Sequence, residues 1–316
     1  MKRVVSISLG SSTRNKKVHV TLLGEEFEIE RIGTDGDMQK YREMVTELDG
    51  KVDAFGVGGT DIYLYAGSKR YVFKEILHLL DGAQKTPFVD GSGLKHTLER
   101  KTVTYLQEHG IVDFRSKRVL LVSAVDRFGM AEALAGLAKS IVFGDLLFGL
   151  GVPIAVRSWG TVQTLAKLML PVIIRLPFKW FYPTGAKQDL NTPAHSKYFA
   201  EADVIAGDFL FIKRFMPEDM RGKIVFTNTT TAEDVIELTR RGVTLLITTT
   251  PVFEGRSFAT NVMEAVLITL LGKRPEMLTP EDYFRKLEEL GWTPGLQELN
   301  PAPAVAETAA GAAGQA

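Results

Sequence analysis

The sequence predicts an α/β fold, in which a mixed α/β N-terminal domain precedes a Rossmann-like domain built on a parallel sheet. The main observation is the stretch 117–251, where short apolar runs alternate with helical patterns. Each apolar run ends in small polar residues, and ligands of open parallel sheets bind outside the carboxyl ends of the strands. A second observation is that the strand–loop–helix rhythm restarts near residue 113, which predicts a domain boundary there.

The N-terminal domain is expected over residues 1–113. Asp37 is a plausible N-cap for one of its helices, and Gly110 a plausible C′ residue for the other. Its predicted helices are 38–48 and 94–109, and its predicted strands are 4–9, 18–23, 27–32, 54–57, 63–65, 71–73 and 88–89.

The Rossmann-like domain is expected over residues 114–275, followed by a C-terminal helix within 276–299. Thr231 with Asp234, and Thr279 with Asp282, have the spacing of capping boxes. The tail 300–316 is rich in Ala, Gly and Pro and is expected to be disordered, because it has too little apolar area to offset its ordering entropy. The predicted strands are 119–122, 154–156, 204–205, 224–226 and 245–247, and the predicted helices are 130–148, 162–175, 197–200, 232–241 and 260–271.

Composition narrows the classes of function. The 38 basic and 38 acidic residues cancel, which argues against nucleic-acid binding, since that needs clustered positive charge. The chain has no cysteine, so disulfides, cysteine-ligated metals and cysteine nucleophiles are excluded. Neither a signal peptide nor an apolar run long enough for a transmembrane helix is found. We therefore expect a cytoplasmic protein with a small-molecule substrate; a homo-oligomer is left open.

The loop from Ser123 to Gly129 stands where a dinucleotide-binding fold carries G-x-G-x-x-G. Asp126 takes the place of the second glycine, where the pyrophosphate approaches. Either Arg127 meets phosphate there, or the loop is a tight turn with Asp126 as N-cap. In the first case the residues that contact cofactor are Ser123, Asp126, Arg127 and Gly129.

Other strand ends carry further candidates for the cofactor. Arg157 and Ser158 follow the predicted second strand, and a basic residue there favours NADP over NAD; a surface arginine paired with a nearby acid is the alternative. The hydroxyls and amide of two clusters suit phosphate, ribose or nicotinamide, although strand propensity and helix capping also explain them. These clusters contain Thr227, Asn228 and Thr229, and Thr248 and Thr249.

Substrate contacts are expected in three loops. The loop after the first strand offers hydroxyls and cations that could hold a carboxylate or phosphate, or it could be a solvated turn. Arg256 and Asn261 open a helix, where an anion binds well, although Arg256 could instead pair with Glu254. The third loop follows the predicted strand 54–57. The candidate residues are Ser11, Ser12, Thr13 and Arg14 of the first loop, Thr60 of the loop after strand 54–57, and Arg256 and Asn261.

Lys95, Asp90 and Asp61 are the candidate catalytic residues, because they follow strand ends of the first domain and can move protons. No metal site is expected, since none of the five histidines makes an H-x-x-x-H pattern. The apolar segment 168–182 is either a lid or partner surface, or is buried between the domains.

The segments 202–208, 222–231 and 248–263 resemble bacterial proteins of the quinate/shikimate dehydrogenase-like family, and the resemblance runs over most of residues 1–275. It implies a substrate domain followed by an NADP-binding Rossmann domain, and hydride transfer between NADP and a ring alcohol. The family's nucleotide arginine corresponds to Arg157, and its substrate serine pair to Ser11 and Ser12. Its catalytic Lys–Asp pair corresponds to Lys95 with Asp90 or Asp61, whereas its glycine-rich loop is largely missing.

Three functional hypotheses follow. The first is an oxidoreductase that transfers hydride between NADP and a hydroxylated carboxylic acid, with Lys95 as proton relay. The second is a transferase or isomerase that binds a nucleotide or phosphorylated metabolite without nicotinamide, which the missing glycines and Asp126 favour. The third is a non-catalytic sensor that binds a nucleotide and presents segment 168–182 to a partner.

Overall fold

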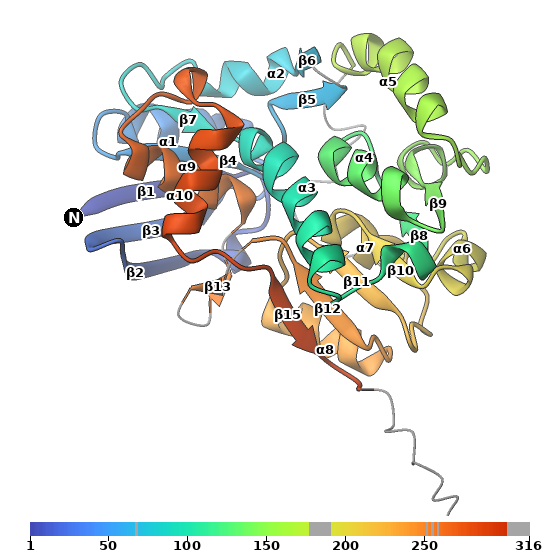
Figure 1. Ribbon diagram of the computed structural model, residues 1–316. Helices are drawn as coiled ribbons and strands as arrows, with labels where there is room; N and C mark the ends of the chain where they lie inside the picture. The colour runs from blue at the N-terminus through green and yellow to red at the C-terminus, as the bar shows by residue number, and fades with distance from the viewer. Residues whose placement is uncertain (67–68, 177–190, 251, 254–255, 258, 302–316) are drawn as a thin grey trace, which may run out of the picture.

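Two β-sheets, each covered by helices, form the body of the protein (Figure 1). The structure is a computed structural model that describes residues 1–66, 69–176, 191–250, 252–253, 256–257 and 259–301. The first sheet has the strand order β2-β3-β1-β4-β7, and the second has the order β15-β12-β11-β10-β8-β9. The predicted α/β class is therefore confirmed.

The first sheet turns the carboxyl ends of four strands toward one edge. β3 and β4 flank β1 in parallel, and β7 pairs in parallel with β4. Only β2 is antiparallel, as the outer strand of the predicted hairpin. The strands are β1 (Lys2–Ser8), β2 (Lys16–Leu22), β3 (Glu25–Gly33), β4 (Ala54–Gly58) and β7 (Phe88–Val89).

Helices from both ends of the chain cover the first sheet. Asp37 caps α1 (Met38–Leu48) as predicted, and α3 (Ser92–Glu108) leads toward the second sheet (Figure 1). Met263 and Val266 of α9 (Thr260–Leu271) pack in one core with Val4 of β1. From its place in the sequence, this helix was expected in the second domain, but its apolar side chains pack against the first sheet. Tyr283 of α10 (Pro280–Glu289) joins the same core.

The second sheet has a Rossmann-like order. Its strands are β8 (Arg118–Leu121), β9 (Ser140–Phe143), β10 (Val204–Ala206), β11 (Ile224–Thr227), β12 (Leu245–Thr248) and β15 (Gly295–Glu298). All pair in parallel except β15, which is antiparallel to β12. Relative to the Rossmann order 3-2-1-4-5-6, β9 and β8 take places 2 and 1, and β10, β11 and β12 take places 4, 5 and 6. The crevice of such a sheet lies outside the carboxyl ends of β8 and β10.

Five α-helices lie within the second half of the fold, in the described residues between Phe128 and Arg240: α4 (Phe128–Leu137), α5 (Trp159–Ile173), α6 (Ser196–Glu201), α7 (Phe209–Phe215) and α8 (Ala232–Arg240). The capping boxes of Thr231 with Asp234 and of Thr279 with Asp282 both form as predicted. Pro171 lies inside α5, which ends two residues later at Ile173.

Two predicted elements between residues 130 and 156 are wrong. The helix expected over 130–148 ends at Leu137, and the β-branched pair Ile141-Val142 continues as β9, followed by a π-helix, η4 (Asp145–Gly149). The strand expected over 154–156 is absent from this described part, where only Val156 forms a single bridge to Phe143. Because β9 already occupies the place beside β8, the second strand of the Rossmann order ends at Phe143, and Asp145, not Arg157, follows its carboxyl end.

The remaining described elements are short. The hairpin β5 (Tyr63–Ala66) and β6 (Lys69–Val72) leads into α2 (Lys74–Leu77), and β13 (Val252–Phe253) pairs with β14 (Arg256–Ser257). Short 3₁₀ turns are η1 (Ser12–Arg14), η2 (His78–Leu80), η3 (Phe114–Ser116) and η7 (Pro275–Met277). The predicted disordered tail, from 302 onward, and part of the predicted apolar segment, 177–182, lie outside the described residues. Within the described residues, no helix combines the length and apolar character needed to cross a bilayer.

Candidate functional site

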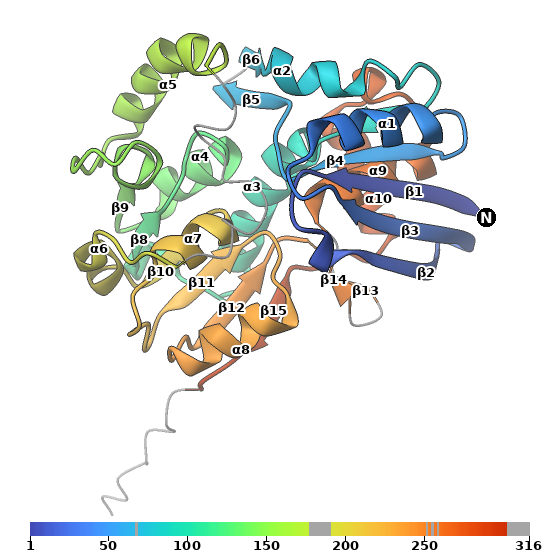
Figure 2. The ribbon, with the colours of Figure 1, turned by 180° about the vertical axis from the view of Figure 1, so that it is seen from behind.

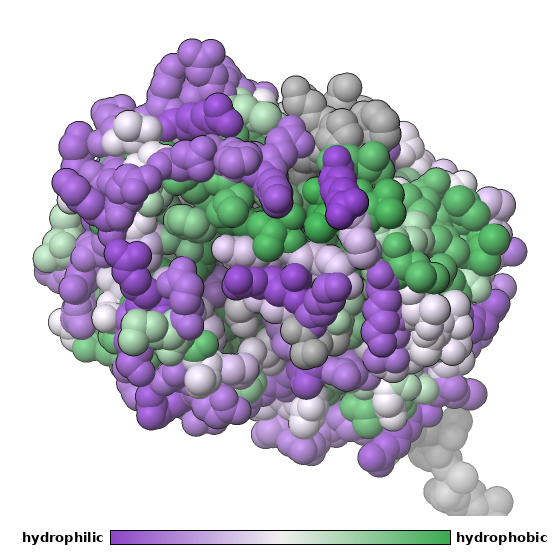
Figure 3. Space-filling view, turned by 90° about the horizontal axis from the view of Figure 1, so that it is seen from above, coloured by the Kyte–Doolittle hydropathy of each residue, from purple (hydrophilic) through white to green (hydrophobic). Residues whose placement is uncertain are grey.

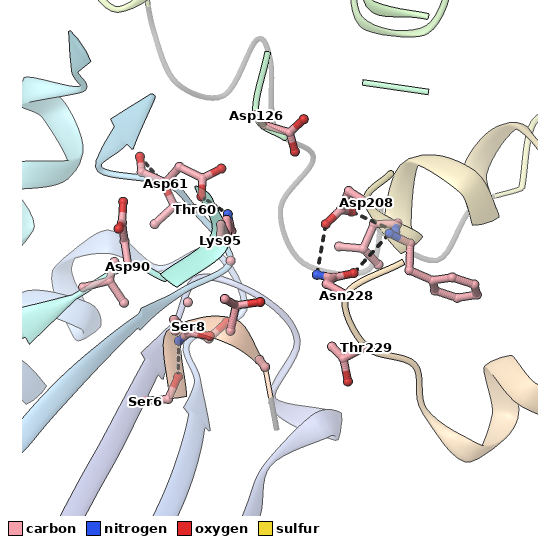
Figure 4. A pocket seen from close by; sticks show the side chains of 18 of the residues that line it. Ser6, Ser8, Thr60, Asp61, Asp90, Lys95, Asp126, Asp208, Asn228 and Thr229 are labelled. Atoms are coloured by element: carbon pink, nitrogen blue, oxygen red, sulfur yellow. Dashed lines mark hydrogen bonds and ion pairs between the residues drawn. The ribbon is translucent and has the colours of Figure 1, made fainter. Parts of the chain in front are cut away.

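A cleft of about 200 Å³ separates the carboxyl edges of the two sheets. Ser8, Thr60 and Asp90 reach it from the ends of the first sheet's strands, and Asp126, Asp208 and Asn228 reach it from the second (Figure 4). The view from behind shows the ends of β1, β3 and β4 turned toward the side on which β10 and β11 lie (Figure 2). The crevice expected from the polar strand ends is therefore present, and both sheets contribute to it.

Lys95 and Asp61 form an ion pair in the cleft. Lys95 is on the first turn of α3, where its amide donates to the carbonyl of Gly91, and Asp61 follows β4. Lys95 Nζ donates to Asp61 Oδ1 at 2.5 Å, and the two side chains are only 14% and 9% exposed. Burial alone would lower the pKa of Lys95, but the negative charge of Asp61, aided by Asp126, outweighs it and raises that pKa. Lys95 is therefore a cation at neutral pH.

Asp90 has a structural role next to the Lys95–Asp61 ion pair. Its carboxylate accepts backbone N–H groups from Ile62 at 2.7 Å, Tyr63 at 2.9 Å and Ser92 at 2.9 Å. These bonds tie the loop after β4 to the start of α3, and thus hold Asp61 and Lys95 in register. Burial raises the pKa of Asp90. Of the two partners considered for Lys95, the structure brings Asp61 into contact and uses Asp90 to support both loops.

Arg127 is a buried clamp with three carboxylates. Its side chain is 1% exposed and forms ion pairs with Glu99 of α3, with Asp208 at 2.7 Å and with Asp126 at 3.5 Å. The acids more than offset the cost of its burial, so the pKa of Arg127 lies above its usual value. Because its charge is balanced inside the protein, Arg127 joins α3 to the ends of β8 and β10. The expected contact with a cofactor phosphate would compete with these acids.

Asp126 is the carboxyl group in the cleft whose pKa lies near neutrality. Ser123 Oγ donates to it at 2.5 Å, and its side chain is 12% exposed. Burial raises its pKa to about 7, although Arg127 opposes the rise. A general acid or base works best when its pKa is close to the operating pH. Asp126 therefore has the right position and pKa to exchange a proton with a bound molecule.

One part of the cleft lining is positively charged. Arg31, on β3, donates to Ser8 Oγ at 3.1 Å and to the Ser11 carbonyl at 3.0 Å. Burial and the nearby Arg14 lower the pKa of Arg31 to about 10, so it remains a cation at neutral pH. In the part of the chain that the structure describes, no carboxylate lies within ion-pair distance of Arg31 or Arg14. Arg214 is a third cation in the lining. These cations suit an anion.

The start of α9 adds hydrogen-bond donors to the cleft lining. Ala259, its N-cap residue, makes no side-chain hydrogen bond, so the amides of the first turn are uncapped by a side chain. Thr260 is 4% exposed and lines the cleft, yet its hydroxyl has no hydrogen-bond partner among the described residues. Asn261 Nδ2 donates to Ser6 Oγ at 2.8 Å. A helix N-terminus with a free buried hydroxyl is a good place for an anion.

Close packing brings α9 to the cleft. A Cβ on Gly91, whose φ is +89°, would lie 2.8 Å from the amide nitrogen of Asn261. A Cβ on Gly58 would lie 3.0 Å from the Cβ of Ser8. Larger residues at these glycines would push the helix away from the strand ends, so the glycines of the loops named in the sequence analysis serve to bring Asn261 and Ser8 together.

Asn228 and Thr229 add neutral groups to the side formed by the second sheet. Asn228 Nδ2 donates to Asp208 at 3.4 Å, while its carbonyl oxygen accepts from Thr227 Oγ1 at 2.9 Å. Thr229 follows and also lines the cleft. A hydroxylated molecule would find both donors and acceptors here. These carboxylates and amides are not gathered as a metal site: no group of three or more His, Asp or Glu suited to a metal occurs among the described residues.

The structure assigns different places to the predicted site residues. Ten of them line the cleft: Arg14, Thr60, Asp61, Asp90, Lys95, Asp126, Arg127, Asn228, Thr229 and Asn261. Ser123 lines an adjoining cavity. Nine line neither of these two pockets: Ser11, Ser12, Thr13, Gly129, Arg157, Ser158, Thr227, Thr248 and Thr249. The side chain of Arg256 lies outside the described residues.

Physical reasons explain several residues outside the cleft. Gly129 packs α4 against α3, because a Cβ there would clash with the His96 carbonyl oxygen. Thr227 donates to the carbonyl of Gly207, and Ser158 caps α5. Arg157 is exposed and follows no strand. The serines of the first loop build η1 and leave the ligand contact to Arg14.

The site also contains residues that the sequence reasoning did not select. Ser6, Ser8, Arg31, Asp208, Arg214 and Thr260 line the cleft. Arg31 is near the carboxyl end of a strand parallel to β1, so the polar strand-end signal was present, but only the sheet order shows that this end faces the cleft.

The β8–α4 loop differs from the pyrophosphate-binding loop that the resemblance implies. The amides of Ala124 and Val125, which would meet a pyrophosphate, both donate to Asp145 Oδ1 at 2.9 Å. Asp145 lies two residues after the second Rossmann strand, in the region where a basic residue would accommodate the 2′-phosphate. Burial raises the pKa of Asp145 even though these amides oppose the rise. An internal carboxylate thus occupies the donors that the phosphate needs.

Comparison with known proteins places the chain in a family. The fold and cleft define a two-sheet α/β protein with a polar cleft between the carboxyl edges. The chain belongs to the family described as Domain of unknown function (DUF8754), which matches residues 93–299. Residues 3–90 match a second family, described as Domain of unknown function (DUF8753). No curated protein matches the chain.

Solved structures resemble the chain only distantly. A galactofuranose binding protein is 10% identical with a TM-score of 0.36, over 92% of this chain and 99% of that one. A periplasmic solute binding protein of an ABC transporter from Actinobacillus succinogenes 130z, with bound D-allose, is 10% identical with a TM-score of 0.38, over 94% and 98%. A glutamate dehydrogenase is 11% identical with a TM-score of 0.36, over 92% and 69%. Likenesses at this level carry no argument about function.

Proposed function

We propose that the cleft binds a small, anionic, hydroxylated metabolite and moves a proton on it through Asp126, with Lys95 and Asp61 beside the reacting group. The observation that carries the proposal is that one cleft contains both cationic groups and a buried acid–base group. Arg31, Arg14 and the start of α9 supply the cationic groups, and Asp126 lies in the same cleft as the Lys95–Asp61 pair.

The charged groups of the cleft have different roles in this proposal. Arg31 and the free hydroxyl of Thr260 hold the carboxylate or phosphate of the ligand and so fix its orientation. Lys95, held as a cation by Asp61, stabilises negative charge that develops on an oxygen of the ligand. Asp126, with a pKa of about 7, takes a proton from the ligand as a carboxylate or returns one as an acid. An isomerase or another proton-transfer enzyme needs only these parts.

The second candidate is the NADP-linked oxidoreductase that the resemblance implies. It is favoured by the contact between Lys95 and Asp61, because that family uses a Lys–Asp pair on its substrate. The substrate half of this hypothesis therefore agrees with the first proposal. The cofactor half requires the amides of Ala124 and Val125, which Asp145 occupies.

Thermal unfolding with a panel of ligands separates the two candidates. The panel contains phosphate, 2-hydroxy acids, sugar phosphates, NAD⁺ and NADP⁺. A ligand at about 100 times its dissociation constant adds roughly 2.7 kcal/mol of stability, which is a shift of several degrees. We expect a hydroxy acid or sugar phosphate to raise the melting temperature and both nucleotides to leave it unchanged. A rise with NADP⁺ would favour the oxidoreductase, and no response to any anion would contradict the first proposal.

A further inference from the structure

A second cavity adjoins the cleft, and its walls are largely apolar. It measures about 120 Å³ and lies between α5, η4 and the segment that carries Leu64 and Phe73. We call it the apolar chamber. Leu146, Val162, Leu165 and Met169 are among its lining residues, and Ser123, Asp126 and Asp145 stand at its polar end. Figure 3, which looks at the molecule from above, shows hydrophobic residues gathered in a band on this face.

The apolar chamber and the cleft adjoin each other and share two lining residues. Asp126 and Phe211 line both cavities. A ligand that occupies both cavities would therefore lie against Asp126 and Phe211. The proton-transfer group of the proposed function thus stands at the boundary between a polar and an apolar space.

The chemistry of the chamber selects its occupant. An engineered apolar cavity of about 150 Å³ takes up benzene, so this chamber has room for a group of similar size. Two carboxyl groups at its polar end, Asp126 and Asp145, disfavour a second anion. Asp145 Oδ2 is buried and has no hydrogen-bond partner among the described residues, so it can accept from a hydroxyl or amine.

We propose that the apolar chamber binds an apolar group of the same ligand, either a branched alkyl chain or a single aromatic ring. A hydroxyl or amine beside that group donates to Asp145 Oδ2, and the anionic group lies at Arg31. This inference rests on the proposed function, which it refines: the substrate is an amphipathic hydroxy or amino acid type of molecule and not a simple sugar phosphate.

A homologous series of ligands tests the chamber separately from the cleft. The dissociation constants of straight-chain monocarboxylates from acetate to hexanoate are measured at fixed ionic strength, together with 4-methylpentanoate and 3-phenylpropanoate. Burial of a methylene stabilises by about 0.8 kcal/mol, so affinity should rise about fourfold with each one until the chamber is full. The amphipathic acids should bind much more tightly than acetate.

Ala166→Leu provides the variant and Ala200→Leu its matched control. Ala166 is a buried part of the chamber wall on α5, and Ala200 is an exposed residue of α6. The larger side chain at position 166 should remove the chain-length dependence while acetate binds as before. The control should keep the fourfold steps. Urea unfolding of both variants checks that each is folded.

The possible results distinguish the two proposals. If acetate binds but affinity does not grow with chain length, the chamber inference is overturned and the proposed function stands. If Ala166→Leu keeps the same steps as the wild type, the apolar groups bind elsewhere and the inference also fails. If no acid binds at all, the proposed function fails and the chamber inference falls with it.

The free oxygen of Asp145 has its own test. The affinities of 4-methylpentanoate and 2-hydroxy-4-methylpentanoate are compared in the wild type and in Asp145→Asn, whose amide oxygen can still accept from the loop amides. The hydroxyl should improve binding to the wild type about two- to tenfold, and the variant should lose this advantage. An equal advantage in both proteins would show that the hydroxyl binds elsewhere.

Discussion

The raised pKa of Asp126 predicts that this residue destabilises the folded protein above neutral pH. Its pKa rises from 3.8 to about 7 on folding, because burial disfavours the carboxylate. Between these values the folded state holds a proton that the unfolded state has lost, so stability falls as pH rises. At about 1.36 kcal/mol per pH unit, the penalty above pH 7 is roughly 4 kcal/mol.

Asp126→Asn removes this titration and keeps an oxygen that accepts from Ser123. We expect the variant and the wild type to be about equally stable near pH 4, and the variant to be more stable by up to roughly 4 kcal/mol at pH 8. Urea unfolding at half-unit pH steps between 4 and 8.5 measures the difference. The reasoning is refuted if the difference between the two proteins does not change with pH.

Asp203→Asn is the control with the opposite sign. Hydrogen bonds from Arg118 lower the pKa of Asp203 to about 2, although burial opposes the change. The folded state therefore loses this proton more readily than the unfolded state, and the carboxylate stabilises the protein above pH 4. We expect Asp203→Asn to lower stability at neutral pH and to approach the wild type as pH falls toward 2. The two variants should thus show opposite pH trends.

Three further predictions follow from contacts in and near the cleft. Removing either member of the buried Lys95–Asp61 pair, as Lys95→Met or Asp61→Asn, should lower the free energy of unfolding in urea by about 3–5 kcal/mol. The double variant should lose less than the sum of the two single losses. Additive losses would show that the pair does not interact. Gly129→Ala should destabilise the protein by about 1–3 kcal/mol, because the new Cβ meets the His96 carbonyl. Gly136→Ala, in open space on the same helix, should stabilise it by about 1 kcal/mol. Equal effects would contradict the close packing of α4 on α3 at Gly129. Burial raises the pKa of Glu264 to about 8, so Glu264→Gln should gain stability relative to the wild type as pH rises from 5 to 9; a constant difference would exclude this titration.

Local signals in the sequence predicted the elements that depend on local chemistry. The Asp37 cap and the Thr231–Asp234 box need only residues within one turn of a helix, and both form as expected. The helix over residues 260–271 has the predicted bounds. Its place on the first sheet was not predictable in the same way, because Val4 and Met263 meet only through the tertiary fold.

The candidate site was predictable only in part, because local signals identify some of its residues and the tertiary fold determines the others. Polar strand ends identified Lys95, Asp61 and Asp126, since any open parallel sheet turns such residues toward its crevice. Arg31 was missed because a hairpin strand carries no sign that its far end runs parallel to β1. Asp145 was missed because the strand that precedes it, β9, was interpreted as the end of a long helix. Because the second strand was expected at residues 154–156 and not at β9, Arg157, and not Asp145, was expected to contact the nucleotide.

Calorimetric titration of an anion into the wild type and Arg31→Gln tests the central claim most directly. The anion is the tightest-binding hydroxy acid or sugar phosphate from the thermal panel, and Arg42→Gln, on the exposed face of α1, is the control. Charge-assisted hydrogen bonds contribute about 1.5–3 kcal/mol, so Arg31→Gln should weaken binding about tenfold or more while the control binds like the wild type. Equal affinity in all three proteins would contradict an anion site at Arg31.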